Sequence, residues 1–284
     1  MTPSFATPVQ APGTVSGAAL QWDTWGVDFS NVADNLRESF RVIAASRAAG
    51  EVRELPGVSV ASSGVTFQMF NAAFLSAPVA GDGELSQRIL MPAMHFNRRG
   101  QEWAYWVCED WMKPRARRSA RRLFERYGLR HSVDLPGMVA EEILPPVKRL
   151  PRLDVRRVSD GPTRDAFCAI GSVCFHVPLP WFQEVFESPS VWDPFSAYVG
   201  YADQEPVATA AIVVGGGALG VYNVATMPGQ QRQGFGESVM RYALADAGKR
   251  FGIRRSILQS TPAGLRLYQR MGYHTVTTVS VYAS

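Results

Sequence analysis

The segment from residue 207 to residue 260 constrains the fold more than any other part of the chain, because it predicts a strand, a turn, a helix and a strand in unbroken succession. Residues 207–214 and 218–227 are rich in β-forming side chains and are separated by three glycines, which predicts a hairpin. Residues 236–251 have apolar side chains at helical spacing and end at a glycine. Residues 256–260 predict a short buried strand. The helix therefore connects two parallel strands in a right-handed crossover.

The turn that precedes this helix, Gln231-Arg-Gln-Gly-Phe-Gly236, is a candidate anion site. Glycines in a strand-to-helix turn let the backbone approach a ligand closely, and the first N–H groups of a helix carry partial positive charge. Arg232 adds a full positive charge. The turn therefore predicts phosphate or pyrophosphate binding, while a tight turn with solvated polar side chains is the alternative.

Two motifs in this half resemble those of the GNAT acyltransferase superfamily. Thr226-Met-Pro228 followed by Gln231-Arg-Gln-Gly234-Phe-Gly236 is similar to the family's motif A, in which a strand end precedes Arg/Gln-x-x-Gly-x-Gly/Ala and a long helix. Leu267-Tyr268-Gln-Arg-Met-Gly272-Tyr273 is similar to its second mark, a tyrosine before a short helix end and Gly-Phe/Tyr. The resemblance covers about residues 153–284. Gln231 departs from the commoner arginine.

The resemblance implies that acetyl-CoA or another acyl-CoA binds as cosubstrate, with its pyrophosphate on the N–H groups at the start of the helix and its pantetheine beside the preceding strand. No metal is expected. The cofactor-binding residues implied are Val224, Ala225, Thr226, Met227, Gln231, Arg232, Gln233, Gly234, Phe235, Gly236, Glu237 and Ser238.

The resemblance also implies catalytic residues for direct attack of an amine on the thioester. Tyr268 matches the general acid that protonates the departing thiolate. Asn223 is neutral and is expected only to orient the amine or a water molecule. The general base stays unassigned. The candidates, each also interpretable as a surface residue, are Glu184, Glu187, Asp193 and His176.

A repeated pattern and a proline-rich segment divide the chain. Residues 122–129 can be laid over residues 266–273 at an offset of 144 with four of eight positions identical, which favours duplication. Residues 143–152 hold three prolines and predict a linker. We therefore expect an α/β fold with a mixed sheet, in two GNAT-like domains. Each should have a mostly antiparallel sheet with a splayed parallel central pair flanked by helices. The predicted boundaries are a disordered tail at 1–20, a degenerate domain at 21–148 and a catalytic domain at 149–284.

The first half lacks the chemistry of the second and is predicted to be inert. Phe124 lies opposite Tyr268 and cannot donate a proton. The Gly81-Asp-Gly83 segment falls about nine residues from the place that the offset predicts, and Asp82 would repel a phosphate. A helix is expected at residues 32–49. An arginine cluster at residues 115–126 fits a solvated helix face better than a nucleic-acid site.

Composition excludes several classes. The longest apolar runs are too short for a membrane span, and the first twenty residues lack the features of a secretory signal. Three cysteines suit a reducing compartment, so a cytoplasmic location is expected. A net charge of +4 is modest for a nucleic-acid binder. Cys168, Cys174 and His176 are too few and too apolar in context to predict a metal site.

The sequence therefore predicts a GNAT-family N-acetyltransferase that transfers acetyl from acetyl-CoA to a primary amine of a small molecule. Its partners would be that amine and, as one option, a second copy of the chain in a homodimer, without nucleic acid or membrane. Two alternatives remain open. One is a regulatory protein that binds acyl-CoA without turnover. The other is a tandem ligase-like acyltransferase similar to mycothiol synthase.

Overall fold

The computed structural model describes the backbone of residues 18–284 and the side chains from residue 28 onward. Its helices are α1 Ala18–Ala45, α2 Asp82–Asn97, α3 Pro114–Arg126, α4 Gly161–Phe175, α5 Leu179–Val185, α6 Phe235–Phe251 and α7 Leu265–Arg270. Its strands are β1 Glu51–Leu55, β2 Val58–Ser62, β3 Asn71–Leu75, β4 Ala104–Cys108, β5 Arg130–Ala140, β6 Asp154–Arg157, β7 Phe195–Ala202, β8 Glu205–Gly215, β9 Ala218–Thr226, β10 Ser256–Gln259 and β11 His274–Ala283.

One sheet of 11 strands runs through both halves of the chain, in the order β1-β2-β3-β4-β11-β5-β10-β9-β8-β7-β6. The β3–β4 and β9–β10 pairs are parallel. The β4–β11 and β5–β10 pairs next to them are antiparallel. The predicted α/β fold with a mixed sheet is confirmed. The expectation of a separate sheet in each half is corrected, because β5 of the first half lies between β10 and β11 of the second and is hydrogen-bonded to both.

Two runs of elements have the same order and the same pairing. The first is β3, α2, β4, α3 and β5, and the second is β9, α6, β10, α7 and β11. In each run, the two strands joined by the long helix are parallel. The last strand of each run pairs with the other run: β11 lies beside β4, and β5 lies beside β10. Each half of the sheet is therefore completed by a strand from the other half.

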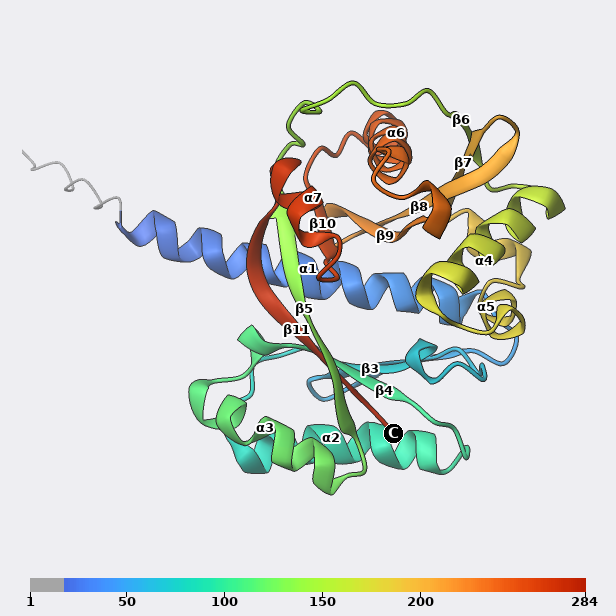
Figure 1. Cartoon of the computed structure of the whole chain (residues 1–284). Helices are drawn as coiled ribbons and strands as arrows, with labels where there is room; N and C mark the ends of the chain where they lie inside the picture. Colours follow the sequence, from blue (N-terminus) through green and yellow to red (C-terminus); the bar gives the residue numbers. More distant parts are fainter. Residues whose placement is uncertain (1–17) are drawn as a thin grey trace, which may run out of the picture.

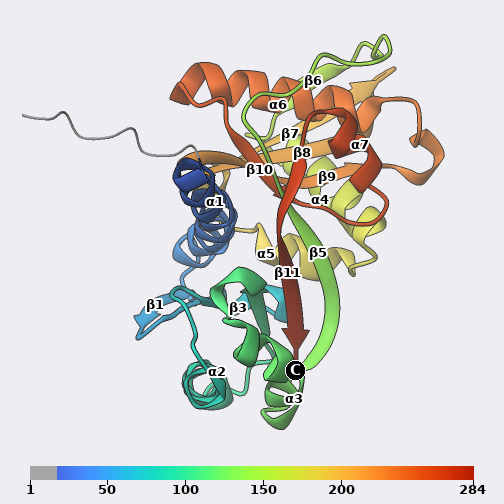
Figure 2. The same cartoon turned by 90° about the vertical axis from the view of Figure 1, so that its left-hand side faces the viewer.

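The helices are divided between the two faces of the sheet. Figure 1 shows α1 running across the middle of the molecule, with α6 above it and α2 and α3 below it, and Figure 2 shows the same arrangement with α1 seen nearly end-on. Even-numbered positions of β8, such as Ile212, pack under α6, whereas Ala211 and Val213 pack on the side of α1 and α4. The sheet thus holds α1 on one face, and α2, α3, α6 and α7 cover the other.

Helix α1 is tied to the β8–β9 hairpin by buried side-chain bonds. The Asn35 amide donates to the carbonyls of Val213, Gly215 and Ala218 at 3.1, 2.9 and 3.0 Å, and its oxygen accepts from the Tyr222 hydroxyl at 2.7 Å. All four polar partners lie far along the chain from Asn35. A buried amide with its bonds satisfied favours one arrangement of the helix against the hairpin.

Helix α1 differs in extent from the predicted helix at residues 32–49. It begins at Ala18 and ends at Ala45, and a turn of residues 46–49 separates it from Gly50. The predicted tail therefore overlaps the helix at residues 18–20, and its remainder lies outside the described residues. We predicted disorder from the lack of charged residues. A lack of charge does not by itself weaken the backbone hydrogen bonds of a helix, so a helix can form there.

The segment between β5 and β6, residues 141–153, which contains the proline-rich residues 143–152, forms neither helix nor strand. It is nevertheless held against the second half. Leu144 N donates to Met271 O at 2.8 Å, Arg241 donates to Leu144 O at 2.7 Å, and the Ser238 hydroxyl donates to Pro151 O at 3.2 Å. No helix among residues 18–284 is both long enough and apolar enough to cross a membrane.

Candidate functional site

The predicted strand–turn–helix–strand unit is present as β9, the turn 227–234, α6 and β10. Helix α6 begins at Phe235, one residue before the predicted start, and Gly234 precedes it with φ +92°. Arg232 also has a positive φ, +63°. Positive φ values at alternate residues point successive backbone N–H groups toward a common side, which is the geometry of an anion-binding nest.

The N–H groups from residue 231 of this turn to residue 237 of α6 have no acceptor in the described part of the chain. The first backbone hydrogen bond of α6 is made by Ser238 N to Gly234 O at 2.9 Å. Within residues 18–284, no acceptor is found for the N–H groups of residues 231–237, and Gly234 supplies no side-chain cap. Such a run of unpaired donors at the positive end of a helix is suited to an anion with several oxygens.

The close approach of α6 to β9 requires Gly236. A Cβ atom at Gly236 would lie 2.8 Å from Thr226 Oγ1. The Phe235 side chain, 8% exposed, packs into the core, so only its N–H faces the turn. The Glu237 carboxylate is bound by Arg241 at 2.8 Å, which reduces its repulsion of an anion at the same helix end.

The polar side chains of the turn contribute in different ways. Gln231 Nε2 donates to Thr226 O at 3.4 Å, and Gln233 donates to Gln230 at 3.2 Å. Arg232 is exposed and has no carboxylate within ion-pair distance among the described residues. Arg232 is thus the one cation of the turn without an ion-pair partner among the described residues. The Ser238 hydroxyl is already bonded to the segment between β5 and β6, at Pro151 O.

Strands β9 and β10 part where the predicted pantetheine channel begins. Their parallel pairing is confined to Leu219–Ser256 and Gly220–Ile257. Beyond these pairs β9 continues to Thr226 without β10 as a partner, so its backbone polar groups on that side are free of strand bonds. Of the predicted channel residues, Ala225 is buried on the α4 side, whereas Val224, Thr226 and Met227 are half-buried.

Asn223 forms a bulge in β9 at this point. Its φ is +50°, and the register of β8 and β9 shifts between Thr209 and Ala211. The Thr209 hydroxyl donates to Asn223 O at 2.8 Å and so fixes the bulge. Asparagine tolerates this conformation better than most residues. A bulge re-aims the backbone, which is a common way to direct an N–H group at a ligand.

Tyr268 lies in α7 on the α6 side of the sheet. Its ring packs on Gly264, where a Cβ would lie 2.6 Å from Tyr268 Cε2, and stands edge-on to Tyr273 at 6.0 Å between ring centroids. The hydroxyl has no hydrogen-bond partner in the described residues, yet its oxygen is not among the fully buried polar atoms. Burial of the ring raises the pKa of Tyr268 to about 12. The phenol keeps its proton at neutral pH, as a tyrosine of ordinary pKa also does, so a proton is present for transfer although its burial makes the phenol a weaker acid.

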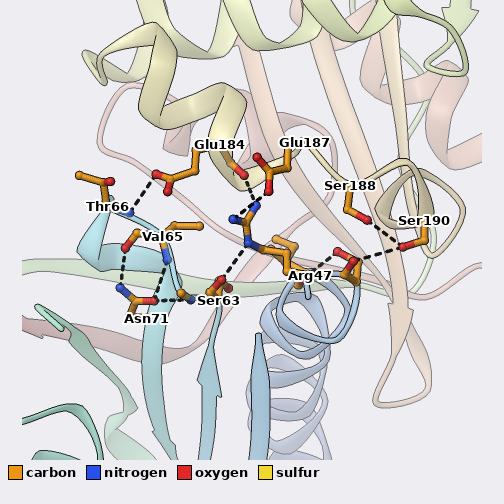
Figure 3. A network of polar contacts seen from close by, with 12 residues as sticks. Arg47, Ser63, Val65, Thr66, Asn71, Glu184, Glu187, Ser188 and Ser190 are labelled. Carbon is orange, nitrogen blue, oxygen red and sulfur yellow. Dashed lines mark hydrogen bonds and ion pairs between the residues drawn. The ribbon is translucent and has the colours of Figure 1, made fainter. Parts of the chain in front are cut away.

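The carboxylates proposed as bases are engaged elsewhere. Figure 3 shows Arg47, just beyond α1, reaching Ser63, Glu184 of α5 and Glu187, which follows that helix. Arg47 Nε donates to Ser63 O at 2.8 Å, Nη1 donates to Glu184 O, and Nη2 lies 3.2 Å from Glu187 Oε1. The Glu184 carboxylate accepts from Thr66 N at 2.9 Å. This network joins the two halves, so Glu184 and Glu187 serve as structural links.

The remaining candidates are also dispersed. Asp193 lies 3.2 Å from Arg157, and His176 is the exposed residue that ends α4. Cys168 is buried, and Cys174 donates to Thr226 O at 3.3 Å. Within residues 18–284, no group of three or more histidine, cysteine or acidic side chains could hold a metal ion.

The start of α2 is the counterpart of the start of α6, which the fixed offset of 144 residues missed. The segments Gly81-Asp-Gly-Glu84 and Gly234-Phe-Gly-Glu237 both open their helices. Each glutamate is paired with an arginine one turn later, Arg88 and Arg241. The first-half glycines do lie nine residues from the place that the offset of 144 predicts, because the connecting loops differ in length, but the two helix starts correspond in the structure. A search for Gly-x-Gly-Glu-x-x-x-Arg would have found the pair.

Two cavities lie away from the predicted site. One, of about 290 Å³, lies between α1, the β1–β2 hairpin and the β8–β9 turn. The other, of about 210 Å³, lies near the end of α6 at Arg250 and Phe251. No residue of the predicted cofactor site lines either cavity.

Comparison with known proteins connects this geometry to a family. Residues 193–275 match the family described as "Acetyltransferase (GNAT) domain". This range contains Asn223, the whole turn and Tyr268. A search of the curated proteins found no match.

Solved structures share the fold over most of the chain. A GCN5-related N-acetyltransferase from Kribbella flavida is 20% identical, with a TM-score of 0.66 over 87% of this chain and 93% of its own. A conserved protein of unknown function from Staphylococcus epidermidis is 13% identical, with a TM-score of 0.61 over 83% and 94%. A GCN5-related N-acetyltransferase from Sphaerobacter thermophilus is 16% identical, with a TM-score of 0.54 over 80% and 76%. Residues 193–275 thus match the GNAT acetyltransferase domain, and the overall fold of the chain is similar to that of these solved structures.

Proposed function

We propose that the chain is an acyl-CoA-dependent N-acyltransferase that transfers acetyl from acetyl-CoA to a primary amine of a small molecule. The observation that carries this proposal is the run of unpaired N–H groups at residues 231–237, beside strands that part from one another. A diphosphate presents several acceptors to such a run, with Arg232 as the added charge.

The chemistry follows from the placement of the remaining residues. The amine nitrogen attacks the thioester carbon, so that a C–N bond forms and the C–S bond breaks. An N–H group of β9 near the Asn223 bulge would stabilise the developing oxyanion. The thiolate takes its proton from the Tyr268 phenol, which is protonated at neutral pH, and the phenolate left behind regains a proton from solvent. The proton released by the amine passes to solvent or to a base that we do not assign.

We also propose that the two halves are copies of one unit, with the first half, about residues 21–148, catalytically inert. The common order of elements and the shared Gly-x-Gly-Glu-x-x-x-Arg pattern support duplication. At the start of α2, however, Asp82 accepts from the Ser119 hydroxyl at 2.8 Å, and Glu84 accepts from Ala80 N at 2.7 Å. Phe124, in the place of Tyr268, is fully buried and stacks on Tyr282.

A second candidate function is acyl-CoA binding without turnover. It is favoured by the engagement of Glu184 and Glu187 with Thr66 and Arg47, which removes two of the carboxylates that could deprotonate an amine. A third, ligase-like transfer with a larger acyl donor, is favoured only by the repeated element order. The homodimer remains a prediction.

The deciding experiment combines heat unfolding with a coenzyme A release assay. We expect acetyl-CoA to raise the unfolding temperature of the full chain and at least one amine of a panel to release free coenzyme A. Stabilisation without release on any amine would select the binding function. If neither acetyl-CoA, longer acyl-CoA nor free coenzyme A changes the unfolding temperature, the proposal is wrong.

A further inference from the structure

Aromatic rings are exposed to solvent where α4 and α5 meet. The side chain of Phe175, at the end of α4, is 39% exposed, and that of Trp181 in α5 is 40% exposed. The half-buried ring of Phe67, between β2 and β3, stacks on Trp181 with 6.4 Å between the ring centroids. We call Phe67, Phe175 and Trp181 the apolar patch. Exposed rings that pack on the core of a protein form a candidate surface for an apolar ligand.

The apolar patch adjoins the end of β9, where the proposed acyl-transfer site begins. Cys174, the last residue of α4 but one, donates from Sγ to Thr226 O at 3.3 Å. Phe67 packs against the same buried cluster as Tyr222, which precedes the bulge of β9, and Met227, which follows it. The cluster beneath the patch therefore reaches β9 on both sides of the bulge.

The segment that carries most of the patch has no charged side chain to bind a second charge. Residues 173–182 contain neither Asp, Glu, Lys nor Arg. The next carboxylate along the chain, that of Glu184, accepts from the backbone of Thr66. An acceptor with an additional ammonium group would find no carboxylate in this segment. An apolar group, in contrast, would be removed from water against the exposed rings.

One ring of the patch comes from the half that we propose to be inert. Figure 3 shows Thr66, the residue before Phe67, facing Glu184 of α5. Thr66 N donates to Glu184 Oε2 at 2.9 Å, and Arg47 donates to the backbone oxygens of both Ser63 and Glu184. These bonds hold the segment of Phe67 against α5. The first half thus contributes to a surface beside the transfer site of the second half.

We propose that the apolar patch binds the non-reacting part of the acyl acceptor, which is a primary amine carried by an aromatic ring or an alkyl chain. This inference rests on the proposed acyl transfer and adds the class of acceptor. The ring or chain lies against Phe67 and Trp181, and the amine nitrogen attacks the thioester carbon from the α4 side of β9. Tyr268 packs on the α6 side, so the proton donor for the thiolate and the incoming amine lie on opposite faces of the sheet.

The first test compares matched amines on the full chain with saturating acetyl-CoA. Phenethylamine and hexylamine carry apolar groups, ethanolamine carries none, and hexamethylenediamine has the hexyl chain with a second charge. We expect kcat/KM for coenzyme A release to be at least about tenfold higher for the two apolar amines than for the other two. Turnover of ethanolamine or hexamethylenediamine that equals or exceeds that of hexylamine would overturn the proposal and leave acyl transfer itself intact.

A binding measurement separates this inference from the proposed function. The same amines would be titrated into the full chain in the presence of coenzyme A. Apolar amines that bind without any release of coenzyme A from acetyl-CoA would support the patch and contradict acyl transfer. No binding and no turnover of either apolar amine would contradict the patch.

Variants assign the surface. Trp181→Ala should raise KM for phenethylamine by about tenfold, because it removes a ring that contacts the substrate, and should leave KM for ethanolamine and kcat within about twofold. Phe67→Ala should act in the same direction. Phe251→Ala is the matched control. It removes a ring that is 45% exposed at the end of α6 far from the turn 227–234, and it should change neither KM.

Heat unfolding shows whether each variant folds. A merely structural role of Trp181 would change the kinetics of phenethylamine and ethanolamine alike, and that result would overturn the proposal. The oligomeric state of each variant would be measured by size-exclusion chromatography. An altered oligomeric state of Trp181→Ala with an unchanged KM for phenethylamine would assign the patch to an interface between copies of the chain and would likewise overturn the proposal.

Discussion

The starts of α2 and α6 have the same Gly-x-Gly-Glu opening and the same place in the sheet. In both, the first N–H groups, those of residues 81–84 and 235–237, have no acceptor in the described chain, so the difference lies in the loop before each helix. At α2, Ala80 N is bound by Glu84, Val79 N is bound by Trp111 O at 2.7 Å, and Asp82 adds negative charge. At α6, the N–H groups of residues 231–237 have no acceptor in the described chain. The shared fold and the shared Gly-x-Gly-Glu motif are therefore not sufficient to form an anion site. The site depends on what the preceding loop leaves unbound.

The largest effect should come from the acid that distinguishes the two halves. Tyr268→Phe, which copies Phe124, should lower kcat by about 10²–10⁴-fold because the thiolate loses its proton donor. Binding of acetyl-CoA should stay within about twofold, measured by titration. Tyr273→Phe is the control, since the Tyr273 hydroxyl bonds with Ser256 at 2.6 Å and has no role in transfer. An unchanged kcat in Tyr268→Phe would remove the assignment.

Matched glycine variants compare the two helix starts directly. Gly236→Val should weaken coenzyme A binding by about 100-fold or more, because a Cβ meets Thr226 Oγ1 at 2.8 Å and the branched side chain crowds the N–H groups. Gly83→Val is the matched control. Its Cβ has no neighbour within 4 Å, so coenzyme A affinity should not change. Heat unfolding of both variants would separate lost binding from lost folding, and equal coenzyme A affinity in two folded variants would contradict the assignment of the site to α6.

A smaller change should sharpen the contrast by adding charge to the α6 turn. Gln231→Arg supplies a second cation beside Arg232 and should tighten coenzyme A binding by about three- to tenfold at low salt. The gain should shrink as salt is raised. Affinity measured at two ionic strengths tests this, and a gain that does not depend on salt would show that charge is not the cause.

The smallest expected effect is on pH dependence. Because burial raises the pKa of Tyr268 to about 12 from its ordinary value near 10, the phenol remains protonated throughout the usual assay range. Turnover should therefore show no alkaline decline attributable to this acid below about pH 10. A fall in kcat near pH 8 that disappears in Tyr268→Phe would contradict the shifted pKa.

The sequence predicted the β8–β9 hairpin, α6 and β10 because each carries local signals: β-rich runs, glycine turns and helical spacing. The sequence also predicted that Gly236 lies at the start of the helix and Tyr268 near the end of a short helix, because local motifs mark both positions. It did not predict the single sheet, since the pairing of β5 with β10 joins residues more than a hundred positions apart and leaves no local pattern. The engagement of Glu184 and Glu187 by Thr66 and Arg47 is likewise a long-range contact, so both looked like free carboxylates.

The central position of β11 sets an order of events during synthesis. When a ribosome has completed β5, both β4 and β5 exist, but the strand that lies between them is still about 130 residues from being made. Until β11 emerges, the facing edges of β4 and β5 stay open to pairing with other chains. Release of a fragment ending in the linker would leave those edges open permanently. The nascent first half therefore needs protection from aggregation until β11 has been made.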